Sequence, residues 1–223
     1  MLQAPRRIGT ALLAVTCSVG AATAGAQVVT YSAHDSHAGV LGPNSSAAQL
    51  SFLSATGGAV GMTFESALPT GVGIVGGTIT NDAVCAARLC GFNTTAGGQS
   101  FLFQYGQSAT FTFATPIDYF GAYFGGVQML NSIEFTDVHG NQVVPIPFSH
   151  EAGGSFVGFT SAGAAISSVT INARASGTGD IITVDDVIFG TLVTSVPEPA
   201  TWPLVMSGFA GLALLAERRR RRA

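Results

Sequence analysis

The sequence predicts an all-β fold, a single antiparallel β-sandwich domain over residues 27–190, on three observations. Short segments alternate polar and apolar residues, which places one face of each segment in a core and the other in solvent. Glycine-rich stretches, such as residues 57–58 and 125–126, separate these segments. No segment of this body shows a long 3.6-residue period, so almost no helix is expected there. Many short strands with turn signals between them are typical of a sandwich.

The clearest strand signals lie in the second half of the chain. Strict alternation marks residues 109–113, 132–136, 168–172 and 182–186. Further strands are predicted for residues 49–53, 60–64, 100–105, 117–124, 142–146 and 155–160. Residues 137–141 have the composition of a hairpin turn, because Gly140 accepts a positive φ and Asn141 tolerates one. The first half of the body, residues 27–98, is expected to complete the same sandwich.

The N-terminus has the three parts of a secretory signal peptide, predicted for residues 1–26. Arg6 and Arg7 form a charged start, residues 8–19 are mostly apolar, and the small residues 24–26 suit cleavage before the body. The sequence therefore predicts an exported chain.

Two cysteines, Cys85 and Cys90, remain after removal of the signal peptide. An even pair in an exported protein favours a disulfide, because the compartment is oxidising. The alternative is a short helix around them, which would place the two thiols on different faces and leave them free.

The C-terminus also has three parts. A linker, residues 191–199, ends in the motif Val196, Pro197, Glu198 and Pro199. Residues 200–216 carry no charge, and as a helix they would span roughly 25 Å, just short of a hydrocarbon core of about 30 Å. Residues 217–223 hold a run of arginines: Arg218, Arg219, Arg220, Arg221 and Arg222. Because arginines stay cytoplasmic, we predict a transmembrane helix with the body outside the membrane.

This tail closely resembles the PEP-CTERM sorting signal of Gram-negative, exopolysaccharide-producing bacteria. The resemblance implies that a membrane enzyme called exosortase reads and cleaves the tail, so that the protein is membrane-anchored only transiently. It covers the tail alone and leaves the activity of the body open.

The body has its own, looser resemblance, carried by residues 111–113, 117–124, 137–140, 156–159 and 182–190. Their order is similar to that of jelly-roll modules common in PEP-CTERM proteins, which are shaped like galactose-binding or carbohydrate-binding domains. The resemblance implies a jelly-roll-like sandwich, and fold alone does not fix a function.

The net charge of the body argues against some classes of binding partner. The chain contains no lysine, and residues 27–196 hold two arginines, Arg88 and Arg174, against ten acidic residues, a formal charge of −8. Such a body has no means of neutralising a phosphate backbone, which excludes nucleic acid as an expected partner.

One candidate site is a structural calcium site formed by Asp180, Asp185 and Asp186. Asp185 and Asp186 end an alternating strand, so one of the two should point inward, where a carboxylate needs hydrogen bonds, a counter-charge or a metal. The alternative is a structural acid that anchors the last strand. No other cofactor is expected.

Aromatic residues give a second candidate site. Most of them should form the core, but Tyr119 and Tyr123 are the best candidates for exposed rings that stack on sugars, because a tyrosine hydroxyl must reach water or a partner.

Other motifs lack their required context. Residues 71–76 match G-x-G-x-x-G, yet no helix is expected after them and residue 93 is not acidic, which favours a glycine-rich strand or loop. His34, Asp35 and His37 have no further ligand at a recognised spacing. Glu65, Glu134 and Glu151 are single glutamates in separate segments, so the sequence shows no pair of carboxylates of the kind that a glycosidase uses.

These observations favour a non-enzymatic protein of the cell surface or the exopolysaccharide matrix, with weak carbohydrate binding as its expected activity. Its expected partners are an exosortase-type enzyme, extracellular polysaccharide, and the membrane before processing. The alternative is a secreted, glycosidase-like hydrolase, for which two carboxylates at a set separation in a cleft would be required. Ice binding is disfavoured, because the sequence has no repeat that would stack its threonines.

Overall fold

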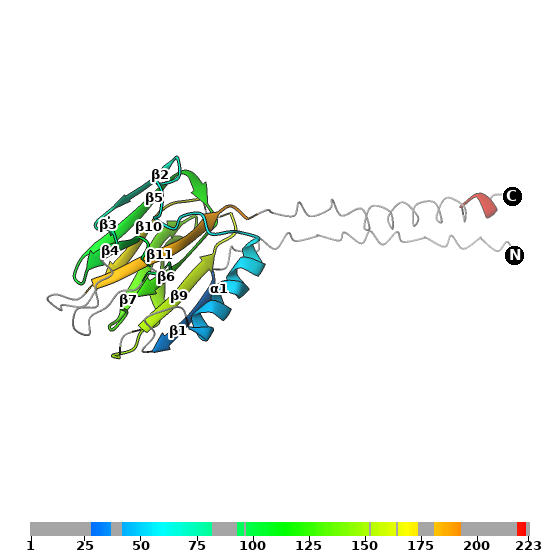
Figure 1. The fold of residues 1–223 in the computed structure, drawn as a ribbon. Coiled ribbons are helices and arrows are strands. Elements are labelled where there is room, and N and C mark those ends of the chain that lie inside the picture. Colours follow the sequence, from blue (N-terminus) through cyan, green and yellow to red (C-terminus); the bar gives the residue numbers. More distant parts are fainter. Residues whose placement is uncertain are drawn as a thin grey trace, which may run out of the picture.

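The computed structural model of the chain describes residues 28–36, 42–81, 93–95, 97–151, 153–163, 165–173, 181–192 and 218–221. Figure 1 shows two packed sheets with one helix, α1 (Pro43–Thr56), on the outside. The strands are β1 (Val29–Ser36), β2 (Val72–Val75), β3 (Thr78–Thr80), β4 (Ser100–Gln104), β5 (Ser108–Ile117), β6 (Tyr119–Gly125), β7 (Asn131–Asp137), β8 (Gly140–Ile146), β9 (Gly153–Thr160), β10 (Ile166–Ala173) and β11 (Ile181–Gly190).

Among the described residues, the strands form a six-stranded sheet in the order β1-β9-β6-β11-β4-β3 and a five-stranded sheet in the order β2-β5-β10-β7-β8. Neighbouring strands in both sheets pair antiparallel. The predicted all-β antiparallel sandwich is therefore confirmed. The first half of the chain completes it, as expected, through β1, β2 and β3.

Phenylalanine is the most frequent residue type in the core between the sheets. Alternation along β5 buries Phe111 and Phe113 and leaves Thr112 exposed. Phe135 of β7 and Phe159 of β9 stack across the two sheets, with ring centroids 4.0 Å apart. Rings bury large apolar areas, so a few of them supply much of the stability of a domain this size.

The predicted hairpin is confirmed. β7 and β8 pair from Asn131↔Ile146 to Asp137↔Gly140, so two residues, Val138 and His139, form the loop. Gly140 has a φ of 108°, a conformation that disfavours residues with a Cβ atom.

The G-x-G-x-x-G segment is a glycine-rich strand and crossover. It forms β2, and the chain then passes through Gly76 and Gly77 to β3 in the other sheet. Gly76 has a φ of 93°, and a Cβ atom on it would lie 2.0 Å from the carbonyl oxygen of Ser108. A strand, not a helix, follows the motif, which agrees with the predicted glycine-rich strand or loop and not with a dinucleotide-binding motif.

Helix α1 corrects two expectations. The strand predicted for residues 49–53 is wrong, because these residues lie inside α1, and the expectation of almost no helix in the body is wrong for the same reason. Among the apolar residues of α1 only Phe52 is buried, so no apolar stripe marks the helix in the sequence. The strand predicted for residues 60–64 is reduced to a single bridge between Met62 and Val187.

Phe52 attaches α1 to the outer face of the six-stranded sheet. Its ring lies over Gly121 of β6 and Gly158 of β9, which are direct cross-strand partners. A Cβ atom on Gly158 would lie 2.7 Å from the ring. Tyr119 and Phe156 surround the same ring, with centroids 5.9 and 5.6 Å from that of Phe52. This second cluster is separate from the core between the sheets.

The two ends of the described body meet at one end of the sandwich. Val29 of β1 pairs with Thr160, Thr160 pairs with Tyr119, and Tyr119 pairs with Gly190 of β11, so these residues form one row across the sheet. The chain therefore enters and leaves the body at the same end.

Candidate functional site

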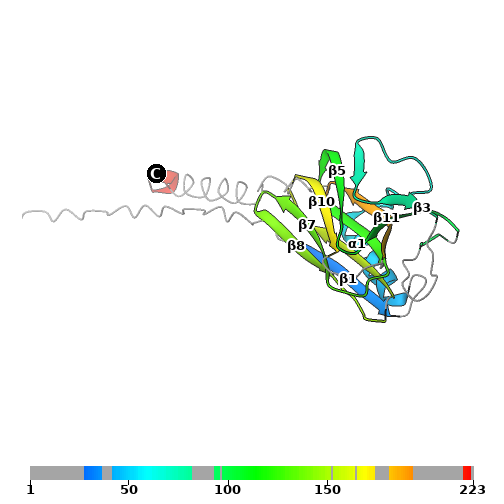
Figure 2. The same ribbon diagram turned by 90° about the vertical axis from the view of Figure 1, so that its left-hand side faces the viewer.

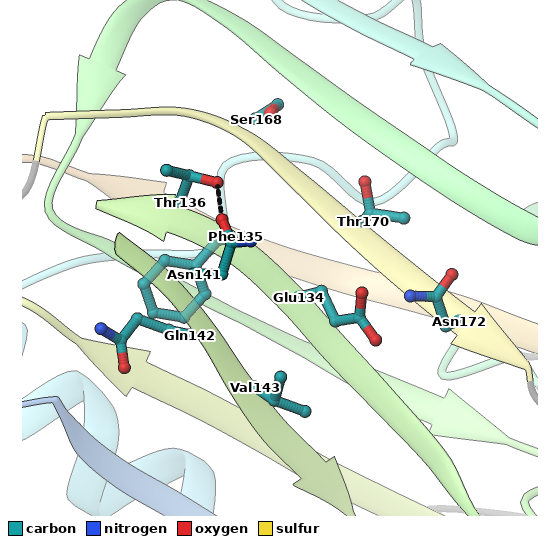
Figure 3. Close-up of a pocket in the computed structure, with 9 residues that line it drawn as sticks. All are labelled: Glu134, Phe135, Thr136, Asn141, Gln142, Val143, Ser168, Thr170 and Asn172. Atoms are coloured by element: carbon teal, nitrogen blue, oxygen red, sulfur yellow. Dashed lines mark hydrogen bonds between the residues drawn. The ribbon is translucent and has the colours of Figure 1, made fainter. Parts of the chain in front are cut away.

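A groove lies on the outer face of the five-stranded sheet, away from the sheet that carries α1. Figure 2 shows β5, β10, β7 and β8 side by side there. The groove has a volume of about 350 Å³. Its described lining consists of Glu134, Phe135, Thr136, Asn141, Gln142, Val143, Ser168, Thr170 and Asn172, shown in Figure 3. We call it the hairpin compartment, because β7 and β8 supply most of it.

Strand alternation brings polar side chains to this face. On β10, Val169 and Ile171 are buried in the core, which leaves Ser168, Thr170 and Asn172 on the outer face along the strand (Figure 3). The pattern that predicted the strands at 132–136 and 168–172 is therefore also the origin of the groove.

Register then places residues of different strands next to one another. Thr170 of β10 lies opposite Thr110 of β5 on one side and Glu134 of β7 on the other. Glu134 in turn lies opposite Val143 of β8. Side chains opposite each other in an antiparallel pair lie about 4.5–5.5 Å apart, so this row forms a continuous polar floor that ends at an apolar side chain.

Hydrogen bonds hold the floor in place. Thr136 Oγ1 donates to Asn141 Oδ1 over 2.8 Å, the dashed contact in Figure 3. The hydroxyls of Thr110 and Thr170 lie 3.0 Å apart and hydrogen-bond across β5 and β10. Ser132 Oγ donates to Glu134 Oε1 over 3.3 Å. The groove is thus largely preorganised, which lowers the entropy cost of binding a ligand.

The chemistry of the lining is that of hydroxyls and amides. Threonine, serine and asparagine side chains each both donate and accept hydrogen bonds. Glu134 is the one acidic residue among the described lining residues, and none of them is basic. Val143, 58% exposed, supplies an apolar surface at the edge strand β8. This combination fits a neutral molecule that carries many hydroxyl groups.

The predicted aromatic site is wrong in its premise of exposure. Tyr119 and Tyr123 are 7% and 1% exposed, because α1 covers them. The hydroxyl of Tyr123 donates to Gln49 of α1 over 3.3 Å, so its partner is the helix and not solvent. Neither ring is available to stack on a sugar.

Asp185 is the buried acid of the pair, but its strand partner is Tyr123, so it lies on the outer face of the six-stranded sheet and not in the core between the sheets as the sequence predicted. It is 2% exposed, and its Oδ2 accepts hydrogen bonds from the backbone N–H and the hydroxyl of Thr94 over 3.0 and 2.7 Å. Burial raises the pKa of Asp185 to about 6, and the charge of Asp186 adds to this, while the bonds from Thr94 and Asp186 lower it. These contacts agree with a structural acid that ties Thr94 to the last strand.

Asp186 lies at a bulge in β11. Its φ is 46°, and the register with β6 shifts between Asp185 and Ile188. Burial, and then the nearby charge of Glu65, raise the pKa of Asp186. Asp180 lies outside the described residues, and within the described ranges no group of three or more His, Cys, Asp or Glu residues could hold a metal. The calcium site that includes Asp180 stays a prediction.

His34 and Asp35, neighbours in the sequence, contact different parts of the structure. His34 Nδ1 lies 2.8 Å from Ser155 Oγ on β9. The carboxylate of Asp35 instead accepts the backbone N–H groups of Asn44 and Ser45 at the start of α1. His37 lies outside the described residues.

Most of the sorting residues also lie outside the described part: Cys85, Cys90, Val196, Pro197, Glu198, Pro199 and Arg222, with residues 1–26 and 200–216. Arg218, Arg219 and Arg220 form a short exposed helical turn that Arg221 continues. In the described ranges, no helix is both long and apolar enough to cross a membrane. The signal peptide, the disulfide and the transmembrane helix stay predictions.

Comparison with known proteins gives distant likenesses only. No protein-family model matches the chain, and no curated protein matches it. Among solved structures, one likeness is to the M60 catalytic domain with two CBM51 domains of Clostridium perfringens ZmpB, at a TM-score of 0.34 and 13% identity, over 58% of this chain and 15% of that one.

Two further likenesses are similar in extent. The enzymatically active domain of tailspike protein 4 of bacteriophage CBA120 gives a TM-score of 0.31 and 22% identity, over 57% of this chain and 20% of that one. TmCBM61 in complex with β-1,4-galactotriose gives 0.32 and 12% identity, over 57% of this chain and 92% of that one. The chain thus spans a fifth or less of the first two chains. At these scores, none of the three indicates a function for this chain.

Proposed function

We propose that the chain is an exported, non-enzymatic protein whose groove on the five-stranded sheet binds a neutral, hydroxyl-rich polysaccharide. The observation that carries the proposal is the lining of the hairpin compartment, where fixed hydroxyl and amide groups stand around Glu134 and no described lining residue is basic. Each of these groups exchanges hydrogen bonds with water for hydrogen bonds with sugar hydroxyls. Such exchanges contribute only about 0.5–1.5 kcal/mol each, so weak binding is expected.

The charge of the body supports a neutral ligand over an anionic one. A chain without lysine, with a formal charge of −8 over residues 27–196, repels uronic acids and sulfated sugars at long range. The described lining also lacks an exposed aromatic ring, since the one aromatic residue among these residues, Phe135, is buried in the core. Affinity must therefore come from many weak polar contacts, which a polymer supplies better than a small molecule.

Affinity electrophoresis tests this proposal. We expect migration of the purified protein to slow in gels that contain a neutral glucan, galactan or mannan, and to be unchanged in gels with alginate. Asn172→Ala should reduce the retardation about five- to tenfold, equivalent to one lost hydrogen bond of about 1 kcal/mol. Asn81→Ala, on an exposed residue outside the groove, is the matched control and should bind like the wild type. Retardation in none of these gels would refute the proposal.

A glycosidase-like hydrolase is the second candidate. It needs two carboxylates on either side of the scissile bond, whereas the described lining of the hairpin compartment contains one, Glu134. We therefore expect no reducing sugar to be released from any polysaccharide that the protein binds. Release that Glu134→Gln abolishes would establish the hydrolase instead.

We further propose that the tail is a transient retention and processing signal of the exosortase type. The support is the order of its parts: an extended Pro-Glu-Pro motif, then an uncharged stretch that is short for a permanent anchor, then five arginines. The processed protein would then remain at the cell surface or in the polysaccharide matrix.

A further inference from the structure

A second compartment adjoins the first along the same sheet. It has a volume of about 340 Å³, against about 350 Å³ for the hairpin compartment. Its described lining consists of Gly106, Gln107, Ser108, Glu134, Asn172 and Ala173. We call it the turn compartment, because the turn between β4 and β5 forms one wall. Glu134 and Asn172 line both compartments, so the two adjoin each other at these residues.

The two compartments lie in line along β10. The hairpin compartment begins at Ser168, and the turn compartment ends at Ala173, the last residue of the strand. Five residues of rise at about 3.3 Å each give a trough roughly 16 Å long. That length exceeds a single sugar ring and suits two or more linked units of an extended chain.

The turn between β4 and β5, which forms one wall of the turn compartment, is hydrogen-bonded to the end of β10. Gly106 N donates to Ala173 O over 2.9 Å, and Ala173 N donates to Gln107 O over 3.2 Å. Gln107 N also donates to Gln104 O within the turn over 3.1 Å. The turn compartment is therefore as preorganised as the hairpin compartment, and both are present before a ligand arrives.

From this geometry we infer that the trough formed by the two compartments holds at least two consecutive units of a polysaccharide chain lying along β10, one in each compartment, with Glu134 and Asn172 at the junction. The inference rests on the proposed function and adds the form of the ligand: an internal stretch of polymer, not a monosaccharide or a chain end. The compartments differ in one respect. Val143 gives the hairpin compartment an apolar surface for the C–H face of a sugar, whereas the described lining of the turn compartment offers glycine, alanine and polar groups.

Chain length is the direct test. Isothermal titration would compare the β-1,4-linked oligomers of glucose, galactose and mannose that contain one, two, four and six units. We expect the tetramer to bind at least tenfold more tightly than the monomer, with little further gain for the hexamer, because the trough is then full. Similar affinities for monomer and tetramer would overturn the inference and leave the proposed function standing.

Variants locate the two subsites. Thr136→Val alters only the hairpin compartment, and Gln107→Ala only the turn compartment, and each should weaken tetramer binding three- to tenfold. The matched controls are Thr78→Val on β3 and Gln104→Ala, an exposed glutamine at the end of β4 that is not among the described lining residues. An effect of only one of the two groove variants would reduce the site to a single compartment and overturn the inference. Binding of no neutral oligomer or polysaccharide would instead refute the proposed function itself.

Discussion

At Gly158 the missing side chain makes room for the ring of Phe52. The same holds for its cross-strand partner Gly121, where a Cβ atom would lie 2.8 Å from that ring. Neither glycine is among those with a positive φ, so steric room, and not backbone conformation, requires them. Such a pair forms a hole in the sheet that one aromatic ring fills.

Gly158→Ala is therefore expected to destabilise the protein by overpacking. A Cβ atom 2.7 Å from the ring must displace Phe52, at a cost of about 1–3 kcal/mol in the free energy of unfolding. Urea denaturation measures this cost. In a Phe52→Leu background the ring is absent, so most of the added cost should disappear. An equal cost in both backgrounds would show that Gly158 is needed for another reason.

Asp185 gives the protein a pH dependence of definite sign. Its pKa is raised to about 6 in the folded state, above an unfolded value near 3.9, so the folded state binds the proton more tightly. Its contribution to stability is complete below about pH 4 and is lost as the pH rises through 6. The limit of this loss is about 3 kcal/mol, reduced by solvent screening.

Comparison of the wild type with Asp185→Asn isolates this contribution. The pKa values of Asp35 and Asp137 are lowered, an effect of opposite sign that both proteins share and that cancels in the difference. We expect the wild type to lose stability relative to the variant between pH 4 and pH 7, measured by urea unfolding. A difference that is constant with pH would contradict the raised pKa.

Individual residues show the limits of sequence reasoning. Alternation predicted that one of Asp185 and Asp186 points into the core, whereas Asp185 is buried on the outer face, where Thr94 from a distant part of the chain contacts it. The burial of Tyr119 and Tyr123 does not follow from alternation either, because it depends on a helix from a distant part of the chain. The groove residues Thr170 and Asn172 were predicted to face outward, but only the register of β10 with β7 places them beside Glu134.

At the scale of elements, α1 is the clearest departure from expectation. Pattern analysis misses it, because Phe52 alone among its apolar residues is buried. Its ends were visible in the sequence: Pro43 occupies the first turn, and Gly57 follows the helix with a φ of 63°. Proline at the start and glycine after the end is the common asymmetry of helices. Local end signals were thus more informative here than periodicity.

Helix α1 takes its N-terminal cap from a strand. Asp35 of β1 accepts the N–H groups of Asn44 and Ser45 over 3.1 and 2.7 Å, in place of a cap from Gly42. Burial would raise the pKa of Asp35, but the hydrogen bonds from Ser45 and Asn44 outweigh it and lower the pKa. The ionised carboxylate therefore stabilises the fold above the unfolded pKa, and this stabilisation is lost as the pH falls through the folded value.

Asp35→Asn should cost about 1 kcal/mol of the free energy of unfolding at pH 7, the usual value of a helix cap. Below the unfolded pKa of about 3.9 the unfolded state binds the proton first, so the difference between wild type and variant should be smaller at pH 3 than at pH 7. Urea unfolding at the two pH values measures both quantities. The same cost at both would mean that the charge of Asp35 contributes nothing to the cap.

At the scale of the molecule, the sequence predicted the sandwich but not the order of the strands in its two sheets. Alternation and glycine-rich turns indicate many half-buried antiparallel strands. Strand order depends on contacts between distant segments, such as β1 with β9, which no local pattern encodes. The passage of the chain from one sheet to the other at Gly76 and Gly77 is likewise not encoded by a local pattern.

The tail makes a prediction about the whole chain. Glu198→Ala, or loss of the host's exosortase, should leave full-length protein in the inner membrane, because the Pro-Glu-Pro motif is then no longer read. Deletion of Arg218–Arg222 should weaken retention before processing. The measurement is the mass of the surface-located protein, expected to lack residues 202–223. Surface protein that still carries them would make the tail a permanent anchor.

The exit of the chain through β11 has a mechanical consequence. β11 is an interior strand, hydrogen-bonded to β6 on one side and to β4 on the other, and it leads directly to Leu192. A polymer held on the opposite sheet and a tether at Leu192 would pull β11 along its length. Its ladder bonds to β6 and β4 would then be loaded in shear and share the force, instead of being peeled apart one by one. Survival under such tension depends on the rate of forced unfolding and not on the equilibrium stability of the domain.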